Sequence, residues 1–315
     1  MKRVAKIAAL GVLALLSLGW LLLISVQGPQ AVQITWQLVK LKVSGRASYL
    51  TWRQALWHVV PSGLRTLRMA PIQSAEACWR VPVRMVKRGS GPCGTQWETP
   101  LGLFWAGAED GHLLAHLVHE ELWLAVYKRP PVAVRQGDVV VDGGAHIGTF
   151  SRFALGEGAR KVVAFEPDPQ NVECLKRNFE EELGAGRLVV VQKALWSSSG
   201  NLDLMRGLNS AQSAVTERAH GLGEPVPATT IDEALKELKL DRVDFIKLDI
   251  EGAERQAMAG AADTLRRFAP RMVLCTYHLP DDAVKITETV LRLEPRYWVF
   301  ATAEQAYFYE GGRER

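Results

Sequence analysis

From about residue 132 onward, short apolar runs alternate with segments of helical periodicity. The apolar runs have the length and β-branched content of buried strands, and turn-forming residues bound them. The predicted strands are 138–144, 161–167, 188–195, 243–250 and 271–278, and the predicted helices begin at residues 149 and 253 or cover 171–183 and 231–238. Strands that alternate with helices predict an α/β fold with a doubly wound, mostly parallel sheet.

Two more apolar runs, residues 297–304 and 306–310, follow one another without room for a helix. They are therefore expected to pair as an antiparallel strand at the sheet edge. Ahead of the core, residues 79–106 combine short apolar runs with Gly and Pro, which predicts a β-hairpin or small meander. Residues 112–127 continue with apolar positions at helical spacing, which predicts a helix.

The hydropathy pattern changes sharply at the N-terminus. Residues 7–26 are twenty residues without a charge, about the length that crosses the ~30 Å hydrocarbon layer as a helix. We expect an uncleaved membrane anchor; a cleaved signal peptide or a start site placed too far upstream are the alternatives. The predicted organisation is an anchor over 1–28, a membrane-proximal segment over 29–75, a hairpin and helix over 76–131, and a core domain over 132–315.

Charge also divides the chain, at about residue 75. The first 75 residues carry nine Lys or Arg and no Asp or Glu, whereas the whole chain has a net charge of only +4, so the rest is acidic. Basic residues beside an apolar run suit an anionic membrane surface, and we expect no nucleic-acid partner. The basic segment also contains three Trp residues, and a short helix there either lies on the membrane interface or packs against the core. Charges flank residues 7–26 on both sides, so the charge rule does not fix topology; we expect the core domain in the cytoplasm.

Two groups of residues that bind metals elsewhere do not predict a metal site here. The four cysteines form no C-x-x-C pair and are expected to be reduced thiols. His112, His116 and His119 fall at helical spacing, but no acidic or Cys partner is arranged around them beyond the adjacent glutamates. A capping or solvent-facing role is therefore favoured for these histidines.

A glycine-rich turn, "VVVDGGAHIGTF", joins the first core strand to a helix. Gly143, Gly144 and Gly148 permit backbone torsions and close approaches that a Cβ forbids, so a ligand can lie against the main chain. Glu166 ends the next strand, where a carboxylate can accept hydrogen bonds from both hydroxyls of a ribose. An adenosine-bearing ligand is therefore expected at the carboxyl ends of these strands.

A nicotinamide dinucleotide and S-adenosylmethionine both carry adenosine, and Asp142 separates them. A dinucleotide has a pyrophosphate, which a carboxylate at the strand end repels. The same carboxylate can attract the amino group and sulfonium of S-adenosylmethionine. His146 stands where the common methyltransferase turn has its middle glycine. The charge sign favours S-adenosylmethionine; an NAD-linked oxidoreductase or a non-catalytic adenosine-binding module are the alternatives.

At this point a resemblance becomes specific. The segments "DGGAHIGTF", "AFEPDPQN", "VVVQKALWSSSGNL", "TTIDEAL" and "VDFIKLDIEGAE" resemble the FkbM family of S-adenosylmethionine-dependent methyltransferases over residues 100–300. That family typically has Asn or His where His146 stands. The resemblance implies a class I methyltransferase fold and transfer of a methyl group, usually to a hydroxyl of a sugar or other secondary metabolite. A lipid-linked glycan is an acceptor that a membrane-proximal enzyme could reach.

Candidate roles follow from strand ends and from this resemblance. The resemblance places Asp249 and Glu251 of "IKLDIEGAE", and His278 after the following strand, beside the acceptor; the alternative for both acids is a helix cap. Oxygen ligands of this kind suit Mg²⁺, but we expect no metal. A polar stretch over 207–221 is a candidate lid. The predicted cofactor-binding residues are Asp142, Gly143, Gly144, Ala145, His146, Gly148, Glu166, Pro167, Asp168, Lys193, Ala194, Leu195 and Asp249.

Overall fold

The computed structural model describes residues 83–310 except 208, 218–222 and 303. The predicted membrane helix over residues 7–26 and the basic segment over 29–75 lie outside these residues. Within the described part of the chain, no helix is both long and apolar enough to cross a membrane.

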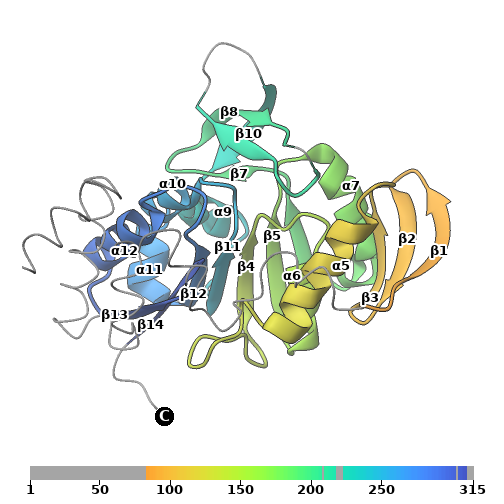
Figure 1. Cartoon of the computed structure of the whole chain (residues 1–315). Coiled ribbons are helices and arrows are strands. Elements are labelled where there is room, and N and C mark those ends of the chain that lie inside the picture. The colour runs from red at the N-terminus through yellow and green to blue at the C-terminus, as the bar shows by residue number, and fades with distance from the viewer. Residues whose placement is uncertain (1–82, 208, 218–222, 303, 311–315) are drawn as a thin grey trace, which may run out of the picture. The chain divides into compact units, whose positions relative to one another are not determined.

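A seven-stranded sheet forms the centre of the described structure (Figure 1). Its strand order is β13-β14-β12-β11-β4-β5-β6, and β12, β11, β4, β5 and β6 run parallel. The bounds are β4 Val139–Gly143, β5 Lys161–Phe165, β6 Leu188–Val191, β11 Phe245–Leu248, β12 Arg271–Cys275, β13 Tyr297–Ala301 and β14 Gln305–Glu310. Because β4 leads to β5 on one side and its other neighbour is β11, the strand order reverses beside β4. A crevice for a ligand is expected at that point.

Helices connect the strands as the periodicity predicts. They are α6 Thr149–Gly156, α7 Pro169–Asn178, α8 Glu180–Gly184, α9 Ile231–Glu237, α10 Glu254–Ala259, α11 Ala262–Phe268 and α12 Asp282–Leu293. The predicted helix over 171–183 is two helices, because Phe179 leaves helical geometry at φ −133° and its ring is buried in the core. The strands β4 and β11 are buried along their whole length, which explains their unbroken apolar runs.

The last two strands pair antiparallel, as predicted, but their order corrects the expectation of an antiparallel edge strand. β14 runs antiparallel to both β12 and β13, and β13 lies outside it. The antiparallel strand is therefore second from the edge. Helix α12 carries the chain past one strand position, and the hairpin then returns β14 into the gap.

The segment before the core contains the predicted meander and helix, with different bounds. β1 Val86–Gly91, β2 Gly94–Thr99 and β3 Gly102–Ala106 form an antiparallel sheet, and the first strand begins at residue 86 within the predicted 79–106. α5 Gly111–His119 continues as a π-helical turn, η2 Glu120–Leu124, and ends at Ala125 in the left-handed region. The predicted helix therefore stops before Tyr127, which packs in the core.

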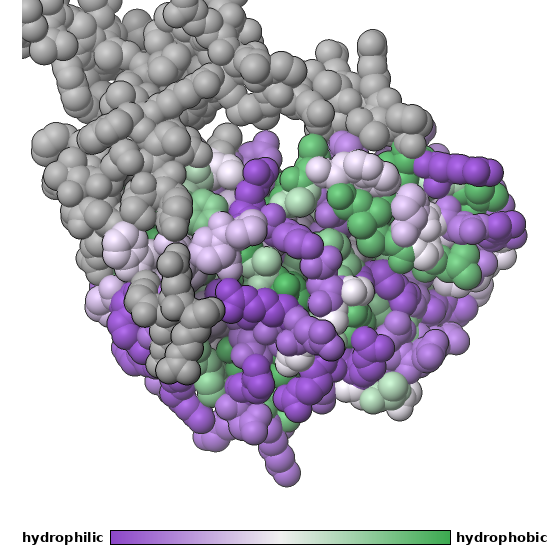
Figure 2. All heavy atoms as spheres, turned by 90° about the horizontal axis from the view of Figure 1, so that it is seen from below, coloured by the Kyte–Doolittle hydropathy of each residue, from purple (hydrophilic) through white to green (hydrophobic). Residues whose placement is uncertain are grey.

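A second sheet was not expected from the sequence. It has the order β7-β10-β8-β9, with β7 Ala194–Leu195, β8 Gly200–Met205, β9 Ala214–Thr216 and β10 Glu224–Thr229. In Figure 1 it lies above the end of the large sheet where β4 and β5 finish. The predicted third strand over 188–195 is thus divided between two sheets, and the candidate lid over 207–221 contains a paired strand. Viewed from below (Figure 2), the described surface is mostly hydrophilic with smaller hydrophobic areas, as is ordinary for a folded protein.

Candidate active site

A pocket opens at the carboxyl ends of β4, β5 and β11, where the strand order reverses. Four segments line it: the turn after β4, the end of β5 with the start of α7, the second sheet with its loop, and the loop after β11. The lining residues are Gly144, His146, Phe165, Glu166, Pro167, Asn171, Lys193, Ala194, Leu195, Ser210, Ala211, Ser213, Val215, Asp249, Ile250, Glu251 and Ala253. Many of the predicted site residues therefore lie around one pocket.

The glycines of the turn have two different structural roles. Gly144 has φ +71°, and a Cβ there would lie 1.9 Å from the carbonyl oxygen of Asp249, so only glycine lets the turn meet the loop after β11. Gly148 has φ +95° and starts α6; its Cβ would lie 2.3 Å from the Phe179 ring. Gly148 is thus required for core packing. Gly143, Ala145 and Gly148 were predicted to bind the cofactor, but they are not among the residues that line the pocket.

His146 links the turn to the second sheet. Its backbone N–H donates to Glu166 Oε2 at 2.8 Å, and its Nε2 lies 2.8 Å from Ser210 Oγ. Ser210 Oγ in turn donates to Asp110 Oδ2 at 2.7 Å, so the hydroxyl proton is used there and Nε2 must carry the ring proton. Burial lowers the pKa of His146 to about 4, which keeps the ring neutral.

Glu166 is held by hydrogen bonds from three groups. Oε2 accepts from the N–H of His146 at 2.8 Å, and Oε1 accepts from the N–H of Asp168 at 2.9 Å and from Asn171 Nδ2 at 3.5 Å. Burial raises the pKa of Glu166 to about 7 although these bonds act in the opposite direction. The carboxylate lines the pocket in a fixed orientation and keeps lone pairs that a ligand hydroxyl could use.

The contacts of Asp142 correct part of the electrostatic argument made from the sequence. Its side chain is fully buried, accepts from Ser151 Oγ at 2.7 Å, and forms an ion pair with Lys247 Nζ at 3.2 Å. Lys247 also donates to the carbonyl oxygens of Gly143 and Gly144 at 3.1 and 2.8 Å. The negative charge of Asp142 is therefore balanced by a lysine, and the pair stiffens the glycine turn without lining the pocket. The sequence shows only a lysine in an otherwise apolar strand, which does not predict this pairing.

Of the two residues that follow Glu166, only one lines the pocket. Pro167 lines the pocket, but Asp168 accepts from the N–H of Gln170 at 2.8 Å as the N-cap of α7 and forms an ion pair with Arg206. The prediction that Asp168 contacts the cofactor is therefore not supported by its position. Lys193, Ala194 and Leu195 line the pocket as expected, although the last two belong to β7 and not to the end of β6.

Asp249 lies at the other end of the pocket, just after β11. Its Oδ2 accepts from Tyr127 Oη at 2.8 Å, and its Oδ1 accepts from Tyr277 Oη at 3.3 Å. Burial acts to raise the pKa of Asp249, but the positive charges of Lys247 and His278 outweigh it, and the pKa is lowered. Asp249 is thus ionised, and each of its oxygens accepts one hydrogen bond from a tyrosine hydroxyl.

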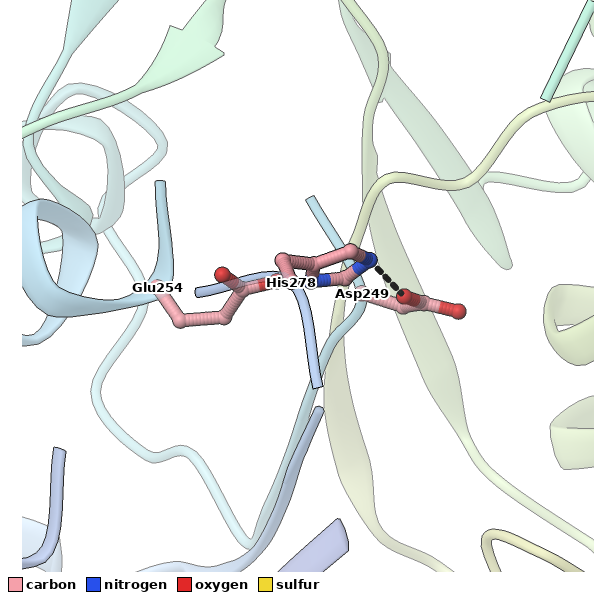
Figure 3. A group of neighbouring side chains, drawn as sticks. All are labelled: Asp249, Glu254 and His278. Atoms are coloured by element: carbon pink, nitrogen blue, oxygen red, sulfur yellow. Dashed lines mark ion pairs between the residues drawn. The ribbon is translucent and has the colours of Figure 1, made fainter. Parts of the chain in front are cut away.

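His278 follows β12 and lies among three carboxylates, of which Asp249 and Glu254 are drawn in Figure 3. Its Nδ1 is 3.1 Å from Glu254 Oε1, and its Nε2 is 3.5 Å from both Asp249 Oδ1 and Glu251 Oε1. Burial acts to lower the pKa of the imidazole, but Glu251, Glu254 and Asp249 together raise it to about 10. At neutral pH the ring is therefore an imidazolium, which cannot accept a proton.

Glu254 was not predicted, and it takes the capping role considered for its neighbours. Its buried carboxylate accepts from the N–H of Ile250 at 2.8 Å and of Gly252 at 3.1 Å, which fixes the loop after β11. In that loop Glu251 has φ +55°, in the left-handed region that non-glycine residues rarely adopt. The sequence signal available was an acid at the first turn of a helix, which is common at caps without any site nearby.

The histidines of α5 lie in separate surroundings. His116 Nε2 is 3.3 Å from Glu120 Oε1, and the ring of His119 stacks on Trp123 at 5.6 Å between centroids. Within the described residues, the one group of His, Cys, Asp or Glu atoms close enough to hold a metal is Asp249, Glu254 and His278.

The mixed seven-stranded sheet, with its pocket at the strand reversal and an acid ending the second parallel strand, defines a class I methyltransferase. A sequence model of the FkbM methyltransferase domain matches residues 142–299. The chain therefore belongs to the FkbM methyltransferase family, for which S-adenosylmethionine is the expected methyl donor.

Named relatives are similar over part of their length. The chain is 31% identical over 169 residues to 31-O-demethyl-FK506 methyltransferase FkbM of Streptomyces tacrolimicus, covering 44% of this chain and 64% of that protein. It is 24% identical over 153 residues to hexuronic acid methyltransferase AglP of Haloferax volcanii, covering 49% of this chain and 61% of that protein. A solved FkbM methyltransferase from Methylobacillus flagellatus KT has 20% identity and a TM-score of 0.46, covering 64% of this chain and 55% of that one. The chain thus spans less than two thirds of the length of these relatives.

Proposed function

We propose that the protein transfers a methyl group from S-adenosylmethionine to a hydroxyl oxygen of a sugar, a glycolipid or another secondary metabolite. The observation that carries the proposal is one pocket with two unlike ends. Glu166 lines one end, and Asp249 and Glu251 line the other. The first can hold an adenosine, and the second can serve a hydroxyl acceptor.

The Glu166 end fits the adenosine part of the donor. Backbone N–H groups orient both oxygens of Glu166, so ribose hydroxyls can donate to lone pairs that no described residue occupies. Phe165, Leu195 and Val215 give the pocket apolar walls against which an adenine can lie. The close approach at Gly144 keeps the main chain next to the pocket.

The loop after β11 supports the reaction. When bound, S-adenosylmethionine supplies a methyl group on a positively charged sulfur, and that sulfur keeps the electron pair of the broken C–S bond. Asp249 and Glu251 put negative charge at this end of the pocket, which favours a sulfonium. An acceptor hydroxyl must lose its proton as its oxygen gains the methyl carbon, and a nearby base must take that proton.

We assign the base to Glu251. His278 is already protonated at neutral pH, and the oxygens of Asp249 accept from Tyr127 and Tyr277. Glu251 lines the pocket, and the contact described for its carboxylate is the 3.5 Å approach to His278 Nε2. A left-handed backbone at a glutamate costs about 1–2 kcal/mol, a strain that is typical of functional positions.

An exposed aromatic ring supports a sugar-like acceptor. Tyr277 is 51% exposed, its ring lies 4.2 Å from the His278 ring, and its hydroxyl contacts Asp249. Such a ring can pack against the apolar face of a sugar while the neighbouring carboxylates meet its hydroxyls. The names of the relatives above, which mention a hexuronic acid and 31-O-demethyl-FK506, support a hydroxyl-bearing acceptor. A lipid-linked glycan is one acceptor of this kind.

Two measurements on the full chain test the proposal. Calorimetry should detect S-adenosylmethionine binding, and Glu166→Ala should weaken it at least about 10-fold, the loss expected for a charge-assisted hydrogen bond. Glu173→Ala, which removes an exposed carboxylate of α7, should leave the affinity unchanged. Labelled methyl should then appear on oxygen in a panel of sugars and glycolipids. Equal affinity in the Glu166→Ala variant, or methyl transfer only to nitrogen or carbon, would contradict the proposal.

A further inference from the structure

We propose that Asp249, Glu254 and His278 form a site for a divalent cation, best matched by Mn²⁺. One ligand atom from each residue lies within 4.8 Å of the others. The residues come from the ends of two adjacent parallel strands and from the first turn of α10 (Figure 3). Ligands at about 2.1–2.2 Å from a six-coordinate ion lie about 3–4 Å apart, so small side-chain shifts would close the site.

The environment of His278 points to a cation. The side chain is only 8% exposed, and neither ring nitrogen has a hydrogen-bond partner of good geometry among the described residues. Carboxylate oxygens nevertheless lie 3.1 Å from Nδ1 and 3.5 Å from Nε2. Without an ion, a proton on each ring nitrogen must separate it from the carboxylate oxygen that faces it, and a divalent cation could take the place of one of these protons.

Few positive charges face the three carboxylates at this end of the pocket. Within the described chain, His278 is the only ion-pair partner found for Asp249, Glu251 and Glu254. Lys247, the nearest strand lysine, is bonded to Asp142 and to the carbonyl oxygens of the glycine turn. With a proton on His278, and with Lys247 shared with Asp142, the carboxylates still outnumber the positive charges, and buried charges are normally paired or bind a metal.

The donor set decides which cation fits. Two carboxylates and one imidazole suit Mn²⁺ better than Mg²⁺ or Ca²⁺, which prefer oxygen ligands alone. Asp249 lines the pocket, so the remaining coordination positions can face the pocket contents. This inference rests on the proposed function for its use: a cation there would lower the pKa of an acceptor hydroxyl, and Glu251, which is outside the trio, could still take the proton.

Electron paramagnetic resonance of Mn²⁺ titrated into the full chain tests the site without any methyl donor or acceptor. We expect one bound ion per chain, with affinity reduced at least 10-fold in Asp249→Asn and in His278→Gln. Asp263→Asn removes a well-exposed carboxylate of α11 and should bind Mn²⁺ like the wild type. Glu254→Gln is avoided, because Glu254 also holds the loop after β11.

Thermal melting checks that each variant is folded. No Mn²⁺ bound by the wild type, or equal affinity in the folded Asp249→Asn and His278→Gln variants, would overturn the metal site. Those results would leave the proposed function intact if S-adenosylmethionine still binds and methyl transfer resists chelators. A failure of the proposed function would instead appear in donor binding, which the Mn²⁺ titration does not involve.

Discussion

The two ends of the pocket hold their ionisable groups in different ways. At the Glu166 end, backbone N–H groups of His146 and Asp168 donate to the carboxylate. At the His278 end, the imidazole lies among the carboxylates of Asp249, Glu251 and Glu254. Both ends are built at the carboxyl edge of the same sheet. The difference is whether fixed dipoles or other charged side chains face each group.

This difference affects the pKa values of the ionisable groups at the two ends. Burial dominates at the first end, where it raises the pKa of Glu166 to about 7 and lowers that of His146 to about 4. Burial is outweighed at the second end, where neighbouring charges raise the pKa of His278 to about 10 and lower that of Asp249. At the first end, Glu166 and His146 can be uncharged near neutral pH, which suits recognition of an uncharged nucleoside. The second keeps charges in place and suits the chemistry of methyl transfer.

The largest expected effect comes from removing the proposed base. Glu251→Gln keeps the size and polarity of the side chain but cannot take up a proton. General-base catalysis contributes about 10²- to 10⁴-fold, so the rate of labelled methyl incorporation should fall by at least about 100-fold. The affinity for S-adenosylmethionine should fall far less than the rate, because Glu166 at the other end is untouched and Asp249 keeps its negative charge near the sulfonium.

Glu173→Gln provides the matched control, since that carboxylate is exposed and outside the pocket. If Glu251→Gln kept most of the wild-type rate while Asp249→Asn lost it, the base would be Asp249. The comparison between the two ends would then stand, but the assignment within the His278 end would not.

The sequence predicted the large sheet well because buried parallel strands leave long apolar runs, as in β4 and β11. It missed the second sheet. β8 buries three consecutive residues with Asp203 among them, and β10 contains Pro225 and Pro227, so neither shows a regular strand pattern in the sequence. The order of β13 and β14 in the sheet depends on where the chain re-enters the sheet after α12. That position is set by tertiary packing and cannot be predicted from local sequence patterns.

The candidate site was predicted where a residue type and a strand end coincide, as for Glu166 and Asp249. The partners of those residues could not be predicted. Tyr127 contacts Asp249 from 122 residues away, and Lys247 meets Asp142 across 105 residues. Both belong to apolar segments where an isolated polar group looks incidental. The pairing of Asp142 with Lys247 therefore gives Asp142 a buried partner that the electrostatic argument from the sequence did not include.

A smaller effect is expected when Glu166 is titrated. The folded pKa of about 7 lies above the ordinary value of 4.5, so the carboxylate becomes the main form only as pH rises through about 7. Ribose hydroxyls donate to the carboxylate, so donor affinity should rise about threefold from about pH 6.5 to about pH 7.5, as the ionised fraction does. Calorimetry of S-adenosylmethionine at these pH values measures it, and Glu166→Gln should be insensitive. A wild-type affinity that falls with pH would show that another group controls this end.

The smallest effect concerns backbone strain at the His278 end. Glu251 and Lys239 both have positive φ, +55° and +53°, but Glu251 lines the pocket whereas Lys239 follows α9 at the surface. At each position the glycine variant should be about 1 kcal/mol more stable to urea unfolding than the alanine variant, because only alanine keeps the Cβ penalty. Both variants at 251 should lose methyl transfer, and both variants at 239 should keep it. Equal stabilities for Glu251→Gly and Glu251→Ala would mean that no strain is held there. A clear difference, together with lost activity, would mean that the loop keeps a costly conformation for its carboxylate.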